Sequence, residues 1–299
     1  MSHRPLNPPE RPTPMNRECE GKVALVTGAS RGIGAAIAQR LASAGAAVAA
    51  VARSLDSHPP DLPGTLRETV ATIEAQGGRA VAIQGDVLEA RSRAQCVAQC
   101  QKELGPIDIL VNNAAMGPYK SFESLTERDF QVTYEANLRA PFELCQLVLP
   151  GMREKRRGWM LNISSATAEH PKGPPFIPWE QMGGHMLYAS SKAALNRLTT
   201  GLAAELYRDG IAVNALSPVA AVITPGVEAM GISGWIEASM IEPVEAMAEA
   251  ALVLCSSDFA TVTGRVAYSL RLLEELGRPI RTLDGRALHD PAKCGTVGR

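Results

Sequence analysis

The chain has 299 residues, of which 45% are hydrophobic and 20% are charged, a composition that suits one large domain with a well-buried core. Its formal net charge of -1 provides no basic field that would attract nucleic acid. No apolar run reaches the length that a transmembrane helix needs. We therefore expect neither a nucleic acid nor a membrane as the partner.

Residues 1–20 are rich in Pro and Arg and contain no apolar stretch, which predicts a disordered N-terminal arm rather than a secretory signal peptide. Six cysteines are spread along the chain, and without an export signal we expect free thiols in the cytoplasm. The five histidines show no metal-ligand spacing, so no metal site is predicted.

Apolar runs typical of strands alternate with helical segments along most of the chain. The predicted strands cover 23–27, 47–51, 80–84, 107–111, 159–163, 211–216 and 264–268. The predicted helices include 34–44, 90–104, a long one at 126–152, 186–208 and 244–255, and a Pro-rich loop is expected at 166–184. Because each crossover helix must pack back onto the sheet, this order predicts a parallel sheet covered on both faces. We expect a single α/β domain at 21–270 and a polar C-terminal tail at 271–299.

A glycine-rich turn follows the first predicted strand, with the sequence Thr27-Gly-Ala-Ser-Arg-Gly-Ile-Gly34. Glycines here allow a sharp turn and let a pyrophosphate approach main-chain N–H groups at a helix N-terminus. The spacing G-x-x-x-G-x-G differs from the general G-x-G-x-x-G fingerprint. Its place between strand and helix predicts a Rossmann-type doubly wound fold. The candidate cofactor-binding residues of the turn are Gly28, Ser30, Arg31, Gly32, Ile33 and Gly34.

Arg53 ends the second predicted strand, about 20 residues after the glycines, where an acid would hold the ribose 2′-OH of NAD. The first acid beyond it is Asp56. Arg31 and Arg53 could together bind a 2′-phosphate through charge-assisted hydrogen bonds, or both could be solvated surface side chains. The sequence favours NADP(H) over NAD(H).

Tyr188 and Lys192 stand four positions apart at the start of a predicted helix, and therefore on one helical face. A nearby ammonium group would lower the pKa of a tyrosine and so make it a better acid–base group at neutral pH. The predicted strand at 159–163 leads into Ser164 and Ser165 at its carboxyl end, the edge where open α/β sheets bind ligands.

These motifs together resemble the classical short-chain dehydrogenase/reductase family. The resemblance covers roughly 22–268, and its combined order is more specific than any one motif. The motifs are Thr27 to Gly34, Asp86-Val87, Asn112-Asn113-Ala114-Ala115, Asn137, Ser164-Ser165 and Tyr188 to Lys192.

The resemblance implies a role for each matching residue. Tyr188 would donate a proton to a carbonyl oxygen, Ser165 would hydrogen-bond that oxygen, and Lys192 would hold the nicotinamide ribose. Asn137 would hold a water that relays protons to Lys192, although a helix-bending role would also explain it. The remaining cofactor contacts that the resemblance implies are Asp86 and Val87 at the adenine and Asn113 and Ala114 at the ribose. Asp86 would equally suit a simple turn after a strand.

Three segments depart from the family's pattern. Ser165 and Tyr188 are farther apart than usual, and the extra Pro171–Trp179 segment is predicted to form one wall of an apolar substrate pocket or to pack against a neighbouring subunit. The usual Pro-Gly after the sixth strand reads Pro218-Val219, which leaves Val222 and Thr224 as the candidates for contacts to the nicotinamide carboxamide. The usual Asp-Gly-Gly ending after the last strand is missing.

Three functions are therefore considered. The first is an NADP(H)-preferring oxidoreductase that interconverts a carbonyl and a secondary alcohol on a small hydrophobic molecule, and the second is a reductase of 3-oxoacyl thioesters. The basic run at 153–157, which an acyl carrier could use, is predicted at the opposite sheet edge. The third is a non-catalytic dinucleotide sensor or scaffold, which would not need Tyr188 and Lys192. The resemblance also implies a homo-oligomer, a tetramer or dimer, paired through the helices at 126–152 and 186–208.

Overall fold

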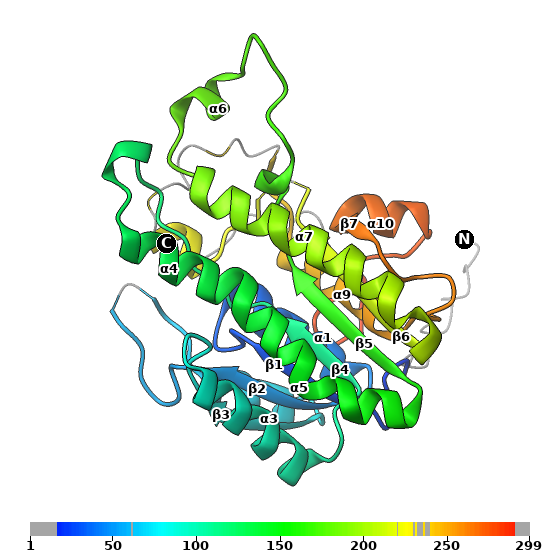
Figure 1. Ribbon diagram of the computed structural model, residues 1–299. Helices are drawn as coiled ribbons and strands as arrows, with labels where there is room; N and C mark the ends of the chain where they lie inside the picture. Colours follow the sequence, from blue (N-terminus) through cyan, green and yellow to red (C-terminus); the bar gives the residue numbers. More distant parts are fainter. Residues whose placement is uncertain are drawn as a thin grey trace, which may run out of the picture.

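A single parallel sheet forms the centre of the computed structural model, which describes residues 17–60, 62–219, 221–229, 231, 236 and 240–290. Its strand order is β3-β2-β1-β4-β5-β6-β7, so the chain winds outward from β1 first to one edge and then to the other (Figure 1). The strands are β1 (Val23–Thr27), β2 (Ala47–Ala52), β3 (Arg79–Gln84), β4 (Ile109–Asn112), β5 (Gly158–Ile163), β6 (Ile211–Ser217) and β7 (Val266–Tyr268). This topology confirms the predicted doubly wound α/β fold.

Helices cover both faces of the sheet because its strands alternate apolar side chains between two cores. Ala24 and Val26 of β1 belong to one buried cluster, whereas Val23 and Leu25 belong to the other. The first core includes α1 (Gly32–Ser43), α2 (Leu66–Ala75), α9 (Val244–Ser256) and α10 (Ser269–Glu275). The second core includes α3 (Ala90–Leu104), α5 (Ala140–Lys155) and α7 (Met186–Leu206).

The long helix predicted at 126–152 is divided into three parts. It consists of α4 (Glu127–Tyr134), a π-helical turn (Glu135–Arg139) and α5. The turn contains Asn137, whose side chain is fully buried and hydrogen-bonded across to a loop and to α7. Side-chain bonding of this kind competes with regular helical bonding, which explains why apolar periodicity alone missed the π turn.

Short helices also lie in segments predicted as loops or as irregular. They are η1 (Phe122–Ser124), η3 (Ala166–Ala168), α6 (Pro178–Met182) and α8 (Pro225–Ala229). The helix predicted at 186–208 is α7 followed by the short η4 (Tyr207–Asp209). Single turns give too few residues for a periodic pattern, so the sequence carried little signal for them. Of the predicted N-terminal arm and C-terminal tail, residues 1–16 and 291–299 lie outside the described residues.

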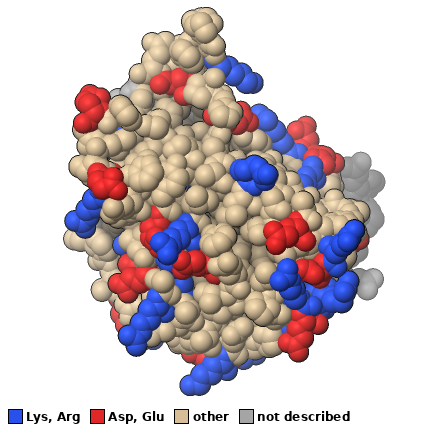
Figure 2. Space-filling model, viewed as in Figure 1, with Lys and Arg blue, Asp and Glu red and all other residues tan. Residues whose placement is uncertain are grey.

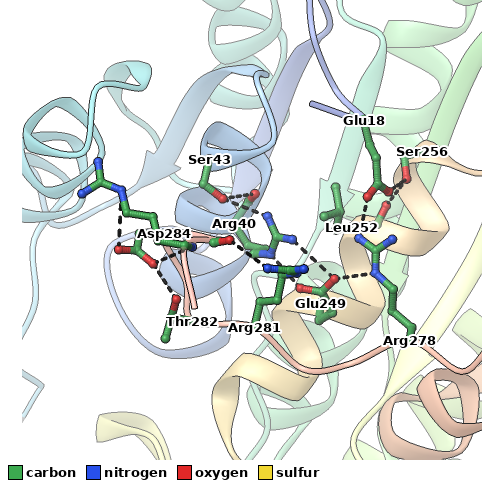
Figure 3. Close-up of polar contacts among 12 residues, drawn as sticks. Glu18, Arg40, Ser43, Glu249, Leu252, Ser256, Arg278, Arg281, Thr282 and Asp284 are labelled. Carbon is green, nitrogen blue, oxygen red and sulfur yellow. Dashed lines mark hydrogen bonds and ion pairs between the residues drawn. The ribbon is translucent and has the colours of Figure 1, made fainter. Parts of the chain in front are cut away.

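A buried ion network joins the two ends of the described chain to α1 and α9 (Figure 3). Glu249 of α9 is fully buried and accepts hydrogen bonds from Arg40 of α1 at 2.7 Å and from Arg278 at 2.7 Å. Arg278 follows α10 and also pairs with Glu18, in the turn before β1. The network therefore fastens the segment after α10 to the helix layer that carries α1.

Charges of both signs are interspersed on the face shown in Figure 2, without a large field of one sign. The top of that view, where α6 projects in Figure 1, carries few charged side chains. Among the described residues, no helix is both long enough and apolar enough to cross a bilayer.

Candidate active site

A cavity of about 840 Å³ opens at the carboxyl ends of β1, β2, β3 and β4. Its floor is the turn between β1 and α1, where the sequence predicted a phosphate-binding loop. This is the edge at which ligands of open α/β sheets bind.

The three glycines of this turn are required by its geometry. Gly28 has φ +66° and Gly32 has φ +56°, values that favour glycine. A Cβ on Gly34 would lie 2.3 Å from the Gly28 carbonyl oxygen and 2.4 Å from Nδ2 of Asn113. The first turn of α1 has no side-chain cap, so its N–H groups are available to an anion. The cradle therefore fits a pyrophosphate.

One buried polar atom in the cavity supports the same fit. Thr133, on α4, lines the cavity and is 1% exposed, and its hydroxyl has no hydrogen-bond partner among the described residues. Buried polar groups are usually hydrogen-bonded, so an unpartnered hydroxyl in the wall of a cavity suits a polar ligand.

Two arginines flank the end of β2. The Arg31 guanidinium donates to the Ser54 hydroxyl at 3.1 Å and to the Gly64 carbonyl at 2.8 Å, which fixes it at the cavity rim. Burial, and then the nearby charge of Arg53, lower the pKa of Arg31. Asp56, the nearest acid in sequence, pairs with Arg67 instead. The rim thus presents two neighbouring cations.

Asp86 and Asn113 line the cavity and also stabilise its walls. Oδ1 of Asp86 accepts from the Leu88 N–H at 3.0 Å, the turn that the sequence left open as its alternative role. Nδ2 of Asn113 donates to the carbonyls of Thr27 and Gly28, which ties the end of β4 to the glycine turn.

Most predicted cofactor residues line this one cavity. They are Gly28, Ser30, Arg31, Gly32, Ile33, Gly34, Arg53, Asp86, Val87, Asn113, Ala114 and Thr224. Tyr188 and Lys192 lie outside its lining, and Val222 is buried in the core beside α9. Sequence reasoning missed Leu62, Leu88, Arg128, Val132 and Thr133 in the wall. In the sequence, the only signals for these residues are that Leu88 closely follows β3 and that Arg128, Val132 and Thr133 stand on α4.

Tyr188 and Ser165 come together although the inserted segment separates them in sequence. The Ser165 side chain is close enough to the Tyr188 phenol to lower its pKa by hydrogen bonding. Its oxygen also accepts from the hydroxyl and N–H of Thr167, at 3.0 and 3.3 Å. Because Thr167 occupies the accepting capacity of Ser165, the serine proton is left to donate toward the phenol or an oxygen beside it.

Lys192 lies one helical turn after Tyr188 and is 2% exposed. Its ammonium group donates to the Ile163 carbonyl, at the end of β5, at 2.7 Å. Nζ lies 5.6 Å from the centroid of the Tyr188 ring. The two side chains share one face of α7, as their spacing predicted.

The pKa of Tyr188 shifts in the direction opposite to the one predicted. Burial, together with the neighbouring phenol of Tyr119, raises it, and the hydrogen bond from Ser165 lowers it only in part. Burial also lowers the pKa of Lys192 to about 7. The expectation that a charged lysine would depress the tyrosine pKa is therefore wrong for the chain alone, because burial is the largest cause of the shift in both groups.

Asn137 holds two parts of the site together. Its amide donates to the Met116 carbonyl at 2.7 Å and to the Ser191 hydroxyl at 2.9 Å, and its oxygen accepts from the Met116 N–H at 2.9 Å. This clamp places the loop after β4 against α7. Gly117 in that loop lies directly over the Tyr188 ring, so close that a Cβ there would approach Cδ2 to 2.6 Å.

The inserted segment projects beyond the sheet and ends in α6 (Figure 1). Trp179 stacks on His185 with the ring centroids 5.1 Å apart, and His185 is three positions before Tyr188. Phe176 and Ile177 remain 46% and 58% exposed. The base of the segment is thus anchored beside the site while its apolar tip faces outward.

Comparison with known proteins assigns the family. The family model described as short chain dehydrogenase matches residues 22–230. The chain belongs to the short-chain dehydrogenase family.

Individual relatives agree with this assignment. A short chain dehydrogenase of Pseudocercospora fijiensis is 37% identical over 217 residues, which are 72% of this chain but only 63% of that relative. The 7alpha-hydroxysteroid dehydrogenase of Escherichia coli K12 is 33% identical over 84% of this chain and 93% of its own length. A 3-oxoacyl (acyl-carrier-protein) reductase of Agrobacterium tumefaciens, solved with NADP bound, is 30% identical and has a TM-score of 0.71, covering 84% of this chain and 93% of that chain.

Proposed function

We propose that the protein is an NADP(H)-preferring oxidoreductase that interconverts a carbonyl and a secondary alcohol on a small hydrophobic molecule. The observation that carries the proposal is the juxtaposition of Ser165, Tyr188 and Lys192 close to the cavity that the glycine turn lines. A phenol, a hydroxyl donor and a buried amine are the groups needed to move a proton at a carbonyl oxygen.

The residues that line the cavity would hold the cofactor, with the glycine turn at the pyrophosphate and Lys192 at the nicotinamide ribose. When bound, the nicotinamide supplies or accepts the hydride at the substrate carbon. Arg31 and Arg53 support a preference for NADP(H), because a 2′-phosphate would neutralise two adjacent cations.

Tyr188 would donate its proton to the substrate oxygen during reduction. A raised pKa suits that role because it keeps the phenol protonated until a negative charge develops on the substrate oxygen. Ser165 would stabilise this charge with the proton that Thr167 leaves available. Asn137 would support a proton relay to Lys192, with its Oδ1 as the side-chain atom that retains accepting capacity.

The substrate is proposed to be apolar because Phe176, Ile177 and Trp179 stand on the segment between Ser165 and Tyr188. Reduction of a 3-oxoacyl thioester is the second candidate, supported by the Agrobacterium reductase. The basic run at 153–157 does not favour it. Lys155 and Arg157 pair with Asp108, which directly precedes β4, at the sheet edge opposite the site.

We also propose a cytoplasmic homo-oligomer, a dimer or tetramer. The described cysteines are free thiols, which supports a reducing compartment. A groove between α4, α5 and α7 exposes Phe130 and Phe142 by 49% and 42%, and a second copy could cover it. A mass measurement that finds only monomer at micromolar concentration would contradict the oligomer.

The experiment that tests the function is a turnover assay with NADPH or NADH and a panel of ketones and 3-oxoacyl thioesters, followed by nicotinamide absorbance. We expect reduction of hydrophobic ketones, faster with NADPH. Tight NADPH binding without turnover of any member would favour the alternative of a non-catalytic sensor or scaffold.

A further inference from the structure

A buried carboxylate supports the loop that follows β6. Glu242, which precedes α9, is 3% exposed. Its Oε2 accepts from the Val219 main-chain N–H at 3.0 Å, and its Oε1 accepts from the Ser269 hydroxyl at the start of α10. One side chain therefore connects three segments that are distant in sequence.

Main-chain bonds reinforce the same connection. The Glu242 N–H donates to the Ala221 carbonyl at 2.9 Å, and the Ala221 N–H donates to the Met240 carbonyl at 3.0 Å. Three residues farther along, Thr224 lines the cavity and lies against Gly32 of the glycine turn. A change in the position of Glu242 would therefore move Ala221, which is only three residues from Thr224 in the cavity wall.

A carboxylate at the buried position 242 is unusual, because buried carboxylates destabilise a fold unless they are well paired. Burial raises the pKa of Glu242, and the bonds from Ser269 and Val219 act against that effect. Without an acceptor there, the part-buried Val219 N–H would lose its hydrogen-bond partner. The family's Pro-Gly at this point is replaced by Pro218-Val219, so this chain holds the loop with a side chain from another segment.

We infer that Glu242 is a positioning residue that holds Val219 and the residues from Ala221 to Thr224 in the geometry needed by the nicotinamide half of the cofactor. This inference rests on the proposed function. It requires no contact between Glu242 and the cofactor, since the residue acts through Val219 and the loop to Thr224.

The test compares two ligands that share the adenosine half. Binding of NADPH and of 2′,5′-ADP, which has the 2′-phosphate but no nicotinamide, is measured by calorimetry for the wild type, Glu242→Met and Glu242→Gln. We expect Glu242→Met to weaken NADPH binding by about tenfold, the effect of leaving one part-buried donor unpaired, and to leave 2′,5′-ADP binding within about twofold of wild type. Glu242→Gln, which can accept from Val219 and donate to Ser269, should restore NADPH binding.

Further variants keep the test decisive. Ser269→Ala removes the other partner of the carboxylate but keeps the bond to Val219, so it should bind both ligands as the wild type does. If Glu242→Met does not fold, Glu242→Asp, which shortens the reach to Val219, carries the same expectation with a smaller effect. Unchanged NADPH binding, or a parallel loss of both ligands, in a folded variant overturns the inference. Failure of the wild type to bind either ligand would instead contradict the proposed function.

Discussion

Lys192 lies on the same face of α7 as Tyr188, yet its ammonium group is hydrogen-bonded to the Ile163 carbonyl at the end of β5. The amine is thereby fixed between the helix that carries the tyrosine and the strand that leads to Ser165. This bond connects β5 and α7, which the inserted segment separates in sequence, and the bond from Asn162 of β5 to Thr199 of α7 reinforces it. The geometry brings Tyr188 and Ser165 together, as the proposed reaction at a carbonyl oxygen requires.

Replacing Tyr188 with Phe is expected to lower turnover by about 10²- to 10⁴-fold, the usual contribution of a positioned proton donor. NADPH binding should change little because the ring still packs under the Gly117 loop. Steady-state kinetics and a binding titration measure the two effects. Tyr134→Phe is the matched control, since it removes a phenol hydroxyl that donates to the Ser190 hydroxyl. A Tyr188→Phe variant with wild-type kcat would refute the assignment.

Replacing Lys192 with Met should change how stability depends on pH. The folded pKa is about 7 and the ordinary value is 10.5, so between these values the unfolded chain binds the extra proton. The free energy of unfolding of the wild type therefore increases as pH rises, by at most about 1.4 kcal/mol per pH unit from this group. The Lys192→Met variant lacks this increase. Urea denaturation of both proteins at pH 7, 8 and 9, without added cofactor, gives the difference. A wild-type advantage that stays flat or shrinks with pH would contradict the buried neutral amine.

The sequence predicted the sheet well because its strands are continuous apolar runs and its long helices have clear boundaries. The 23–27 strand and the 90–104 helix coincide with β1 and α3. The π turn at Asn137 and the short α6 were not predicted, since each depends on contacts between distant segments or is too short for periodicity.

In the candidate site, too, some features could be predicted from the sequence and others could not. The glycine turn and the Tyr188–Lys192 pair could be located because their chemistry depends on local spacing. The pKa directions could not be predicted, since they depend on how deeply the fold buries each group. Glu242 gave no signal in the sequence because its partners, Val219 and Ser269, are distant along the chain.

Replacing Arg53 with Asp should weaken NADPH binding and favour NADH. The new carboxylate would repel a 2′-phosphate and could accept a hydrogen bond from a 2′-OH. The ratio of kcat/KM values for the two cofactors measures the change. Arg79→Asp, an exposed charge reversal at the other end of the sheet, is the control for net charge. An unchanged ratio in Arg53→Asp would make Arg53 a solvated bystander.

Replacing Glu249 with Ala should destabilise the fold by about 3–5 kcal/mol, because Arg40 would remain buried without its carboxylate. Chemical denaturation measures the loss. Glu275→Ala removes the partially exposed partner of Arg265 and should cost less than about 1 kcal/mol. Equal losses in the two variants would show that the network in Figure 3 contributes no more than a surface pair.

Replacing Trp179 with Ala tests whether the inserted segment forms a wall of the substrate pocket. Its ring stacks on His185, just before Tyr188, so its removal should loosen the segment beside the reacting groups. We expect a higher KM or an altered preference among ketones, with oligomeric mass and NADPH affinity unchanged. Phe176→Ala should act in the same direction if the exposed tip closes over the substrate. Leu288→Ala, which removes a 61% exposed apolar side chain from the C-terminal segment, controls for surface hydrophobicity. Loss of the oligomer with unchanged kinetics per folded site would instead make the segment a subunit interface.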